Sequence, residues 1–139
     1  MRPQFISSNP FMLFMLFAVL GLFTACTEEE PTLSERLDGE WDVESFTVDG
    51  VEFMQTTVTS FELEFDDEGE DQGDTKWTII FFDGSTQVIE GEFEINDGGK
   101  ELRLSDNTGY NDFDMEMSGE DLELTGIIAG ERWEIEAEK

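Results

Sequence analysis

From Glu40 to the C-terminus, hydrophobic and polar residues alternate along short segments of the chain. The clearest cases are residues 61–65 (FELEF), 113–117 (FDMEM) and 133–137 (WEIEA). A period of two puts apolar side chains on one face of a strand and carboxylates on the other face. The pattern therefore predicts antiparallel strands with one buried face and one solvated face.

Turn residues divide the alternating segments. Asp49-Gly50 and Asp83-Gly84 are hairpin signals because Asp and Gly tolerate positive φ, and Gly-rich breaks recur further along the chain. Between the breaks the sequence predicts eight strands, at residues 40–48, 58–66, 75–82, 86–96, 100–105, 110–117, 120–127 and 131–138.

Only one segment of this region favours a helix. Residues 32–37 (TLSERL) can form one turn, with Thr32 as N-cap and Glu35 three residues later. Eight short strands joined by tight turns predict an all-β fold, a small antiparallel up-and-down β-barrel whose closure removes exposed edges. A two-sheet sandwich is the alternative, and sequential hairpins without a long crossover favour the barrel.

The inward face of this barrel would be rich in aromatic residues. An eight-stranded barrel is just wide enough to be filled by its own side chains or to hold one small ligand. The aromatic content favours a filled core, whereas flexible Met115 and Met117 favour a variable apolar surface. If a pocket exists, we expect its mouth near the hairpin ends opposite Trp41, with a lining of Trp41, Trp77, Phe81, Phe113, Met115, Met117 and Trp133.

The N-terminal segment has a different pattern. Residues 11–23 (FMLFMLFAVLGLF) are apolar, and Arg2 is the only charged side chain before them. As a helix this run is about 20 Å long at ~1.5 Å per residue, against a hydrocarbon core of about 30 Å. It is too short to span a bilayer and fits a signal peptide. It leads through Thr24 and Ala25 into Cys26, the one cysteine of the chain.

This arrangement resembles a bacterial lipoprotein precursor. The resemblance implies cleavage before Cys26 and lipid on the thiol and the new amino group of this residue. It divides the chain into a signal peptide (1–25), a lipidated cysteine with an acidic tether (26–32) and a β-barrel domain (33–139). An ordinary secreted protein with a stray cysteine is the alternative.

Thr27 and the three glutamates after it (28–30) resemble the acidic segment that directs lipoproteins of Bacteroidota to the outer cell surface. The resemblance implies a protein anchored in the outer membrane by lipid, on either its surface or its periplasmic face. Several acyl chains anchor a protein stably, whereas one does so only marginally. A plain solvated tether is the other interpretation of these glutamates.

The first predicted strand opens with Leu37-Asp38-Gly39-Glu40-Trp41. This motif resembles the Gly-x-Trp opening of lipocalins and the Leu-x-Gly-x-Trp opening of lipocalin-like domains in Bacteroidota lipoproteins. The resemblance implies a lipocalin-like barrel that binds a small apolar or amphipathic ligand. In lipocalins this tryptophan packs at the closed barrel end under an arginine of the last strand, and Arg132 is the candidate here.

Charge changes the picture of possible partners. Residues 26–139 contain six Lys and Arg against 35 Asp and Glu, a net charge of −29. This excess argues against nucleic acid as a partner, which needs clustered cations, and against lying flat on an anionic membrane. Self-repulsion of this size calls for screening by salt or bound cations. The even spread of the charge favours a salty environment over Ca²⁺ binding.

The densest acidic stretch lies in a predicted loop at residues 66–74. Ca²⁺ takes six to eight oxygen ligands, and this loop offers several. Its spacing does not match an EF-hand, because Gly69 stands where a second ligand is required. A surface loop is the simpler interpretation, and the candidate ligands are Asp66, Asp67, Glu68, Glu70, Asp71 and Asp74.

Catalysis finds little support. The chain contains no histidine, which excludes Ser-His and Cys-His couples and imidazole metal sites. Paired carboxylates could in principle hydrolyse a glycoside, which makes a carboxylate hydrolase the third hypothesis. Among 35 carboxylates, however, chance proximity is expected, and no pair stands in an apolar setting that would raise its pKa. We therefore expect a binding protein without a resident cofactor. The alternative is a filled barrel that acts as a structural or protein-interaction module of the cell envelope.

Overall fold

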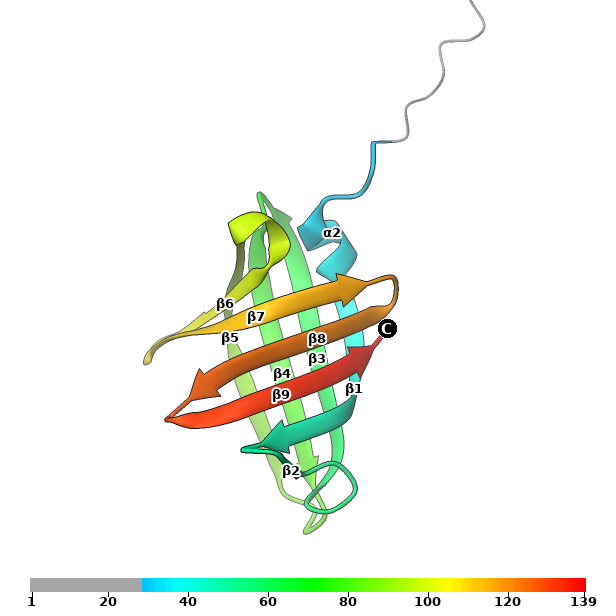
Figure 1. The fold of residues 1–139 in the computed structure, drawn as a ribbon, viewed down its shortest axis with the longest axis vertical. Helices are drawn as coiled ribbons and strands as arrows, with labels where there is room; N and C mark the ends of the chain where they lie inside the picture. Colours follow the sequence, from blue (N-terminus) through cyan, green and yellow to red (C-terminus); the bar gives the residue numbers. More distant parts are fainter. Residues whose placement is uncertain (1–28) are drawn as a thin grey trace, which may run out of the picture. The chain divides into compact units, whose positions relative to one another are not determined.

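The computed structural model describes residues 29–139, in which one short helix precedes nine strands (Figure 1). The elements are α2 (Leu33–Leu37), β1 (Gly39–Val48), β2 (Val51–Glu52), β3 (Val58–Gly69), β4 (Gln72–Phe81), β5 (Thr86–Asn96), the 3₁₀ turn η1 (Asp97–Gly99), β6 (Glu101–Asp106), β7 (Gly109–Ser118), β8 (Asp121–Ile128) and β9 (Glu131–Glu138).

The strands form one closed sheet. From β3 to β9 each strand pairs antiparallel with the next, β1 pairs with β3, and a further β1–β9 pairing closes the ring. The two-residue strand β2 only extends one end of β1. The chain is thus an up-and-down barrel of eight strands, as the turn pattern predicted, and the sandwich alternative is wrong.

Strand β1 belongs to two walls of the barrel. Its first residues pair with β3 and its remaining residues pair with β9. The register shifts between Val43 and Ser45, which marks a β-bulge. A bulge bends a strand and increases its twist, so β1 can turn the corner that closes the sheet.

The predicted loop at residues 66–74 is wrong. Strand β3 continues to Gly69 and β4 begins at Gln72, so most of this stretch is paired strand. Only Glu70 and Asp71 form the turn, with φ of 57° and 58°. Acidic residues depress strand propensity, but pairing of β4 with both neighbours supplies backbone hydrogen bonds that outweigh this local preference.

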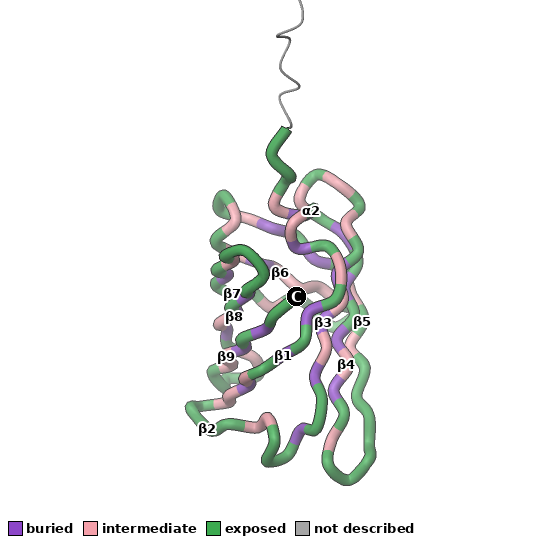
Figure 2. Tube along the Cα trace, turned by 90° about the vertical axis from the view of Figure 1, so that its right-hand side faces the viewer, coloured by how far each residue is buried: buried purple, intermediate pink, exposed green. Residues whose placement is uncertain are grey.

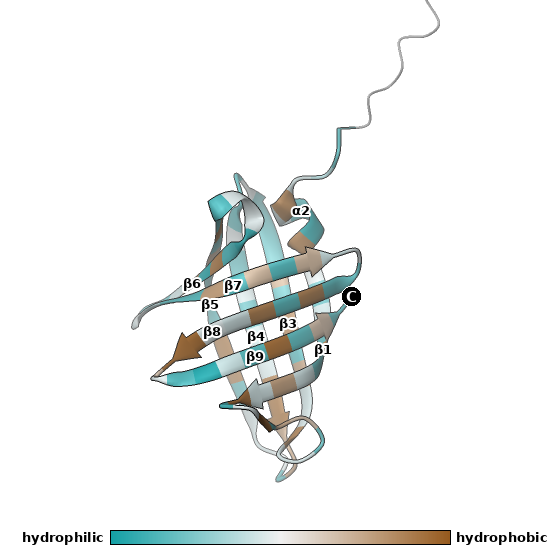
Figure 3. Cartoon of the chain, viewed as in Figure 1, coloured by the Kyte–Doolittle hydropathy of each residue, from teal (hydrophilic) through white to brown (hydrophobic). Residues whose placement is uncertain are grey.

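The core confirms the predicted alternation. The alternation predicts a set of inward-facing side chains on β3 to β9, and every one of them is buried or packs against the buried cluster. They are Phe61, Leu63, Phe65, Trp77, Ile79, Phe81, Phe93, Ile95, Phe113, Met115, Met117, Leu122, Leu124, Trp133 and Ile135. Buried and exposed residues alternate along the strands (Figure 2), as do hydrophobic and hydrophilic ones (Figure 3). Aromatic contacts cross the interior, since the ring of Trp77 lies 5.8 Å from those of both Phe61 and Phe113.

Helix α2 covers one end of the barrel. Its capping box is complete, because Thr32 Oγ1 accepts from the backbone N–H of Glu35 at 3.3 Å and the Glu35 carboxylate accepts from Thr32 N–H at 2.7 Å. Leu37 and Trp41 are fully buried, and Trp41 Nε1 donates to Leu37 O at 2.7 Å. Thus the opening motif joins the helix to the first strand through a buried indole.

The residue that lies over Trp41 is Lys139, and the prediction of Arg132 is wrong. Lys139 Nζ lies 5.1 Å from the centroid of the Trp41 ring and donates to Arg36 O at 3.0 Å. Antiparallel pairing of β9 with β1 sets Trp133 opposite Val48, at the far end of β1 from Trp41. Arg132 is therefore at that far end, where it pairs with Glu134 at 2.9 Å.

Residues 31–139 contain the whole closed sheet and its buried cluster. A segment with its own core and a closed sheet has the elements of a domain that can fold on its own. Within residues 29–139, no helix is both long and apolar enough to cross a bilayer. The predicted signal peptide, Cys26 and the first tether residues lie outside the described residues.

Candidate ligand pocket

Strand pairing is interrupted on both sides of the β6–β7 hairpin. Strand β5 pairs with β4 from residue 86 to 94 but with β6 only from residue 92 to 96. Likewise, the β7–β8 pairing stops at Phe113 and Gly126. Within residues 29–139, the tip of the β6–β7 hairpin therefore has no strand partner on either side. In Figure 1 this tip projects from the barrel.

A pocket of about 400 Å³ lies beside this interruption. This volume is within the usual range of about 300–1,000 Å³ for small-molecule sites. We call it the side pocket. Its apolar lining consists of Trp77, Ile89, Leu104, Phe113, Ile128 and Trp133. The remaining lining residues are Thr75, Gln87, Glu90, Gly91, Ser105, Asp106, Thr108 and Asn111.

Trp77 is held in a fixed orientation in this wall. Its Nε1 donates to Thr75 Oγ1 at 3.0 Å, and Thr75 Oγ1 donates to Glu64 O at 3.0 Å. Both Trp77 and Thr75 face inward on β4 and are buried. Because this buried N–H group has a hydrogen-bond acceptor, its burial carries no penalty for an unpaired donor. The hydrogen bonds also hold the indole in one orientation in the pocket wall.

Trp133 contributes a second indole to the wall, but its N–H group has no hydrogen-bond partner in the described chain. It is half-buried, and its ring lies 4.9 Å from that of Phe46. Its Nε1 is buried and finds no acceptor within residues 29–139. An unpaired buried donor costs about 1–3 kcal/mol, so packing alone holds this side chain.

The charged residues of the lining are acidic. Glu90 and Asp106 line the pocket, and no Lys or Arg of the described chain does. The hydroxyl of Thr108 donates to Asp106 Oδ1, and the backbone N–H groups of Thr108 and Gly109 donate to the same oxygen. These bonds, that of the hydroxyl first, lower the pKa of Asp106, so it stays ionised in mildly acidic solution.

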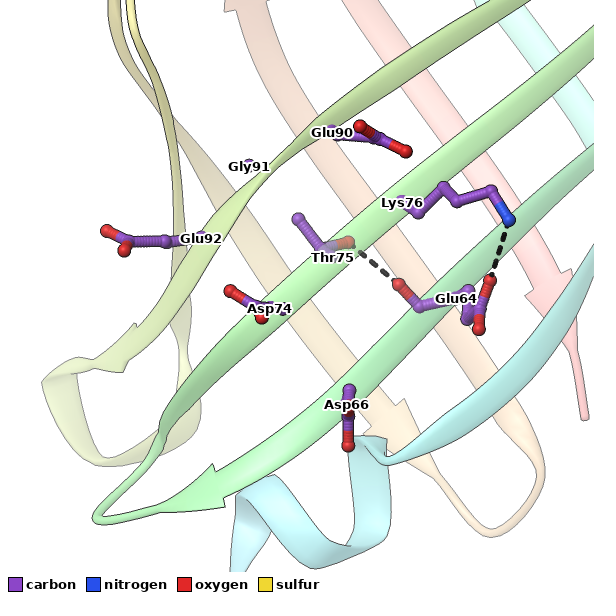
Figure 4. Close-up of a pocket in the computed structure, with 8 residues that line it drawn as sticks. All are labelled: Glu64, Asp66, Asp74, Thr75, Lys76, Glu90, Gly91 and Glu92. Carbon is purple, nitrogen blue, oxygen red and sulfur yellow. Dashed lines mark hydrogen bonds and ion pairs between the residues drawn. The ribbon is translucent and has the colours of Figure 1, made fainter.

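A second hollow lies on the outer face of β3, β4 and β5 (Figure 4). It measures about 510 Å³ and is open to solvent, and Lys76, which pairs with Glu64 at 3.3 Å, is the one cation among its lining residues in the described part of the chain. The carboxylates are spread over three strands rather than gathered around one point. Those beside the ion pair belong to Asp66, Asp74, Glu90 and Glu92.

The predicted calcium ligands do not converge. Asp66 lies opposite Asp74 in the β3–β4 pair, whereas Glu70 and Asp71 form the turn. Asp67 accepts from Gly69 N–H at 2.8 Å, and Glu68 is exposed. Across residues 29–139, no group of three Asp, Glu, His or Cys side chains is placed to hold a metal ion.

Three of the seven predicted ligand residues, Trp77, Phe113 and Trp133, line the side pocket together. Trp41 is sealed beneath α2, and Phe81 lines a separate hollow of about 390 Å³ with Phe82. Two further predicted residues, Met115, which is buried, and Met117, which is half-buried, are not part of the pocket lining.

Sequence reasoning missed the aliphatic part of the pocket, namely Ile89, Leu104 and Ile128. The signal for Ile89 and Leu104 was present, because both take inward positions in predicted strands. As expected, the pocket avoids Trp41 and reaches the ends of the β6–β7 and β8–β9 hairpins. The alternation of hydrophobic and polar residues does not show, however, that β5 and the β6–β7 hairpin separate beside the pocket.

The carboxyl groups with shifted pKa values give no support for acid catalysis. Hydrogen bonds from the Ser85 and Thr108 hydroxyls lower the pKa of Asp83 and Asp106, and a hydrogen bond from Arg132 lowers that of Glu134. A general acid working near neutral pH needs the opposite shift.

No protein-family model and no curated protein matches the chain. Solved structures do. Bovine odorant-binding protein in complex with undecanal has a TM-score of 0.52 and 25% identity, over 81% of this chain and 76% of that one. The barrel is lipocalin-like.

Two designed proteins share this lipocalin-like barrel. A redesigned β-barrel has a TM-score of 0.59 and 13% identity, and covers 81% of this chain and 98% of its own. A de novo fluorescence-activating β-barrel has a TM-score of 0.54 and 11% identity, with 76% and 95% covered. At such identities the two designs bear on the fold alone.

Proposed function

We propose that this protein is a lipid-anchored binding protein whose barrel captures a small apolar or amphipathic molecule in the side pocket. The observation that carries the proposal is the pocket itself, about 400 Å³ with two indoles and four other apolar side chains in its wall. Concave, mostly apolar sites with a few polar groups are the usual sites for such ligands.

The similarity to a solved ligand complex supports the same role. Bovine odorant-binding protein, which has the same kind of barrel, is solved with undecanal, a small apolar molecule. In this chain the aliphatic Ile89 and the aromatic Phe113 offer an apolar environment for a molecule of that kind. The proposal includes no enzymatic step, no resident cofactor and no nucleic-acid partner, in keeping with the absence of histidine and the acidic composition.

The direct test uses the soluble chain that starts at Thr27, purified without added ligand. Native mass spectrometry should show an added mass that organic extraction removes, and decan-1-ol should bind the extracted protein and change its tryptophan emission. Trp77 and Trp133 line the pocket, so both report on occupancy.

Two neighbouring substitutions provide a matched pair for this test. Gln87→Phe places a ring at the pocket lining, whereas Val88→Phe places the same ring on a residue outside that lining. Both positions are exposed, so neither change disturbs the core. We expect Gln87→Phe to weaken decan-1-ol binding about tenfold or more and Val88→Phe to leave it unchanged. Equal effects of the two would refute a ligand site in the side pocket.

The anchoring part of the proposal rests on Cys26 and the apolar run before it. Cys26→Ser should move the protein from the membrane fraction to the soluble fraction of its host, and Thr27→Ser should not. The outer membrane is the proposed location, and fractionation on a density gradient tests it. If the Cys26→Ser protein is cleaved normally and still stays in the membrane fraction, lipid on Cys26 is not what anchors the protein.

A second candidate function is that of a protein-interaction module in the cell envelope. The observation in its favour is the apolar surface of the β4–β5 hairpin, where Phe82 is 60% exposed and Val88 49% exposed. Under this alternative, Phe82→Ser abolishes copurification of a defined partner, while Gln87→Phe leaves it intact. The extracted protein then binds no decan-1-ol.

A further inference from the structure

We propose that the side pocket selects a cationic amphiphile, an aliphatic chain that ends in an amine or a quaternary ammonium group. This inference rests on the proposed function, because it assumes that the pocket is a ligand site. It goes further by naming the charge of the ligand, and hence the class of lipid-like molecule that the protein takes and the class that it rejects.

The charge of the lining is the first argument. The two acidic side chains of the pocket are Glu90 on β5 and Asp106 at the end of β6, and no Lys or Arg of the described chain joins them. Both residues are exposed, so they stand where the pocket meets solvent. An apolar tail against Trp77 and Phe113 therefore leaves its head group near two carboxylates.

The surface around the opening of the side pocket adds to this negative charge. An outer hollow of about 580 Å³ between β5 and the β6–β7 turn shares Glu90 and Asp106 with the pocket and adds Glu92. A head group that leaves the pocket between these strands meets three carboxylates. A carboxylate or phosphate head group at the same place is repelled by all three.

Cations on nearby strands are already paired. Lys76, opposite Glu90 in the β4–β5 pair, bonds to Glu64 at 3.3 Å. Arg103 on β6 bonds to Asp112 at 2.6 Å and lies 4.4 Å from the centre of the Tyr110 ring. Neither cation lines the pocket, and each forms an ion pair with a neighbouring carboxylate. The electrostatic potential at the opening of the side pocket therefore stays negative.

Long-range electrostatics favours a cation as well. The net charge of −29 on residues 26–139 also attracts cations over a distance and speeds their association, an effect that salt weakens. Head-group recognition and long-range attraction thus act in the same direction.

The test compares three probes with one ten-carbon tail: decyltrimethylammonium, decan-1-ol and decanoate, each below its micelle concentration. The protein is the chain from Thr27, and tryptophan emission reports binding. At low salt we expect the cation to bind about tenfold more tightly than the alcohol, and decanoate about tenfold more weakly than the alcohol. In 1 M NaCl, where the screening length is about 3 Å, the three affinities should converge.

Rim variants show whether the effect is local. Glu90→Gln and Asp106→Asn should each weaken decyltrimethylammonium binding about threefold to tenfold and leave decan-1-ol binding unchanged. Glu123→Gln is the matched control, since it removes the same charge from an exposed position on β8 that is not part of the pocket lining. An equal effect of Glu123→Gln would overturn selection by the rim.

The outcomes separate this inference from the proposed function. If decan-1-ol binds and Gln87→Phe blocks it, but the cation binds no more tightly, the pocket is a ligand site without charge selection and the inference is wrong. Tightest binding of decanoate overturns it as well. If none of the three probes binds, the proposed function itself fails.

Discussion

The end of the barrel under α2 and the side at the β6–β7 hairpin each contain a tryptophan but differ in how completely their polar groups are bonded. Trp41 is fully buried and its Nε1 donates to Leu37 O, whereas Trp133 is half-buried and its Nε1 has no acceptor within residues 29–139. Thus the same side chain closes the fold at one site and leaves a polar group unsatisfied at the other.

Strand pairing follows the same division. At the capped end, Gly39 to Asp42 of β1 pair with β3, and α2 covers the strands. At the pocket side, β5 loses its β6 partner before residue 92 and β7 loses its β8 partner before Phe113. At the pocket side, the interrupted pairing and the unpaired indole N–H coincide with the side pocket, where we propose that a ligand enters. Regions of low local stability are where binding sites are commonly found.

Alanine substitutions of the two tryptophans should give the largest contrast. Trp41→Ala removes a fully buried side chain and its hydrogen bond, and we expect a loss of about 3–5 kcal/mol in the free energy of unfolding. Trp133→Ala should cost clearly less and should weaken ligand binding instead. Urea unfolding followed by circular dichroism measures both. Equal losses would show that the two sites carry equal structural weight.

Gly91 tests the point beside the side pocket at which β5 and β6 diverge. A Cβ atom at Gly91 would collide with the backbone carbonyl oxygen of Ser105, where β5 and β6 are still close. Gly91→Ala must push these strands apart, and we expect it to cost about 1–3 kcal/mol. Glu92→Ala, one residue along on the exposed face, is the control. A stable Gly91→Ala protein would mean that β5 and β6 separate easily at this point, and its ligand affinity would then show whether the pocket widens.

Phenylalanine substitutions isolate the two indole N–H groups. Trp41→Phe leaves Leu37 O without its donor in a buried place, and should cost about 1–2 kcal/mol beyond the loss of ring area. Trp133→Phe removes a donor that has no acceptor, so it should be nearly neutral or stabilising. The midpoints of urea unfolding of the two variants measure this difference. A larger loss of stability for Trp133→Phe than for Trp41→Phe would contradict the contrast between the two N–H groups.

Glu52 gives the smallest effect, and one that depends on pH. Burial alone would raise the pKa of its carboxyl, but hydrogen bonds from the Ser45 hydroxyl and from the Phe46 and Met54 N–H groups outweigh it and lower that pKa below 4.5. A lowered folded-state pKa contributes stability above pH 4.5 that is lost as the pH falls through the folded value.

We therefore expect Glu52→Gln to cost about 0.5–1 kcal/mol at pH 7, a modest value because the site is largely solvated. The difference from the parent protein should shrink below pH 4. Thermal unfolding at pH 7 and pH 3.5 measures it, with exposed Glu120→Gln as the control. A difference that stays constant with pH would show that the carboxylate is not what braces β1 against β2.

Much of this molecule was determined by local sequence. Alternation in segments such as residues 61–65 and 133–137 decided which side chains face inward, and Thr32 and Glu35 marked the capped helical turn. These features depend on neighbours a few residues away, and a pattern of period two or a capping box can record them. The barrel itself followed from the order of hairpins, since strands joined by tight turns pair with their neighbours.

Only the tertiary structure decided the rest. The register of β9 against β1 placed Lys139 over Trp41 and sent Arg132 to the other end, although Arg132 stands next to a tryptophan in the sequence. Pairing of β4 on both sides turned a predicted acidic loop into strands. The side pocket exists because β5 and the β6–β7 hairpin diverge after a few paired residues. Register and divergence are sums over contacts between distant segments, and no short stretch of sequence contains them.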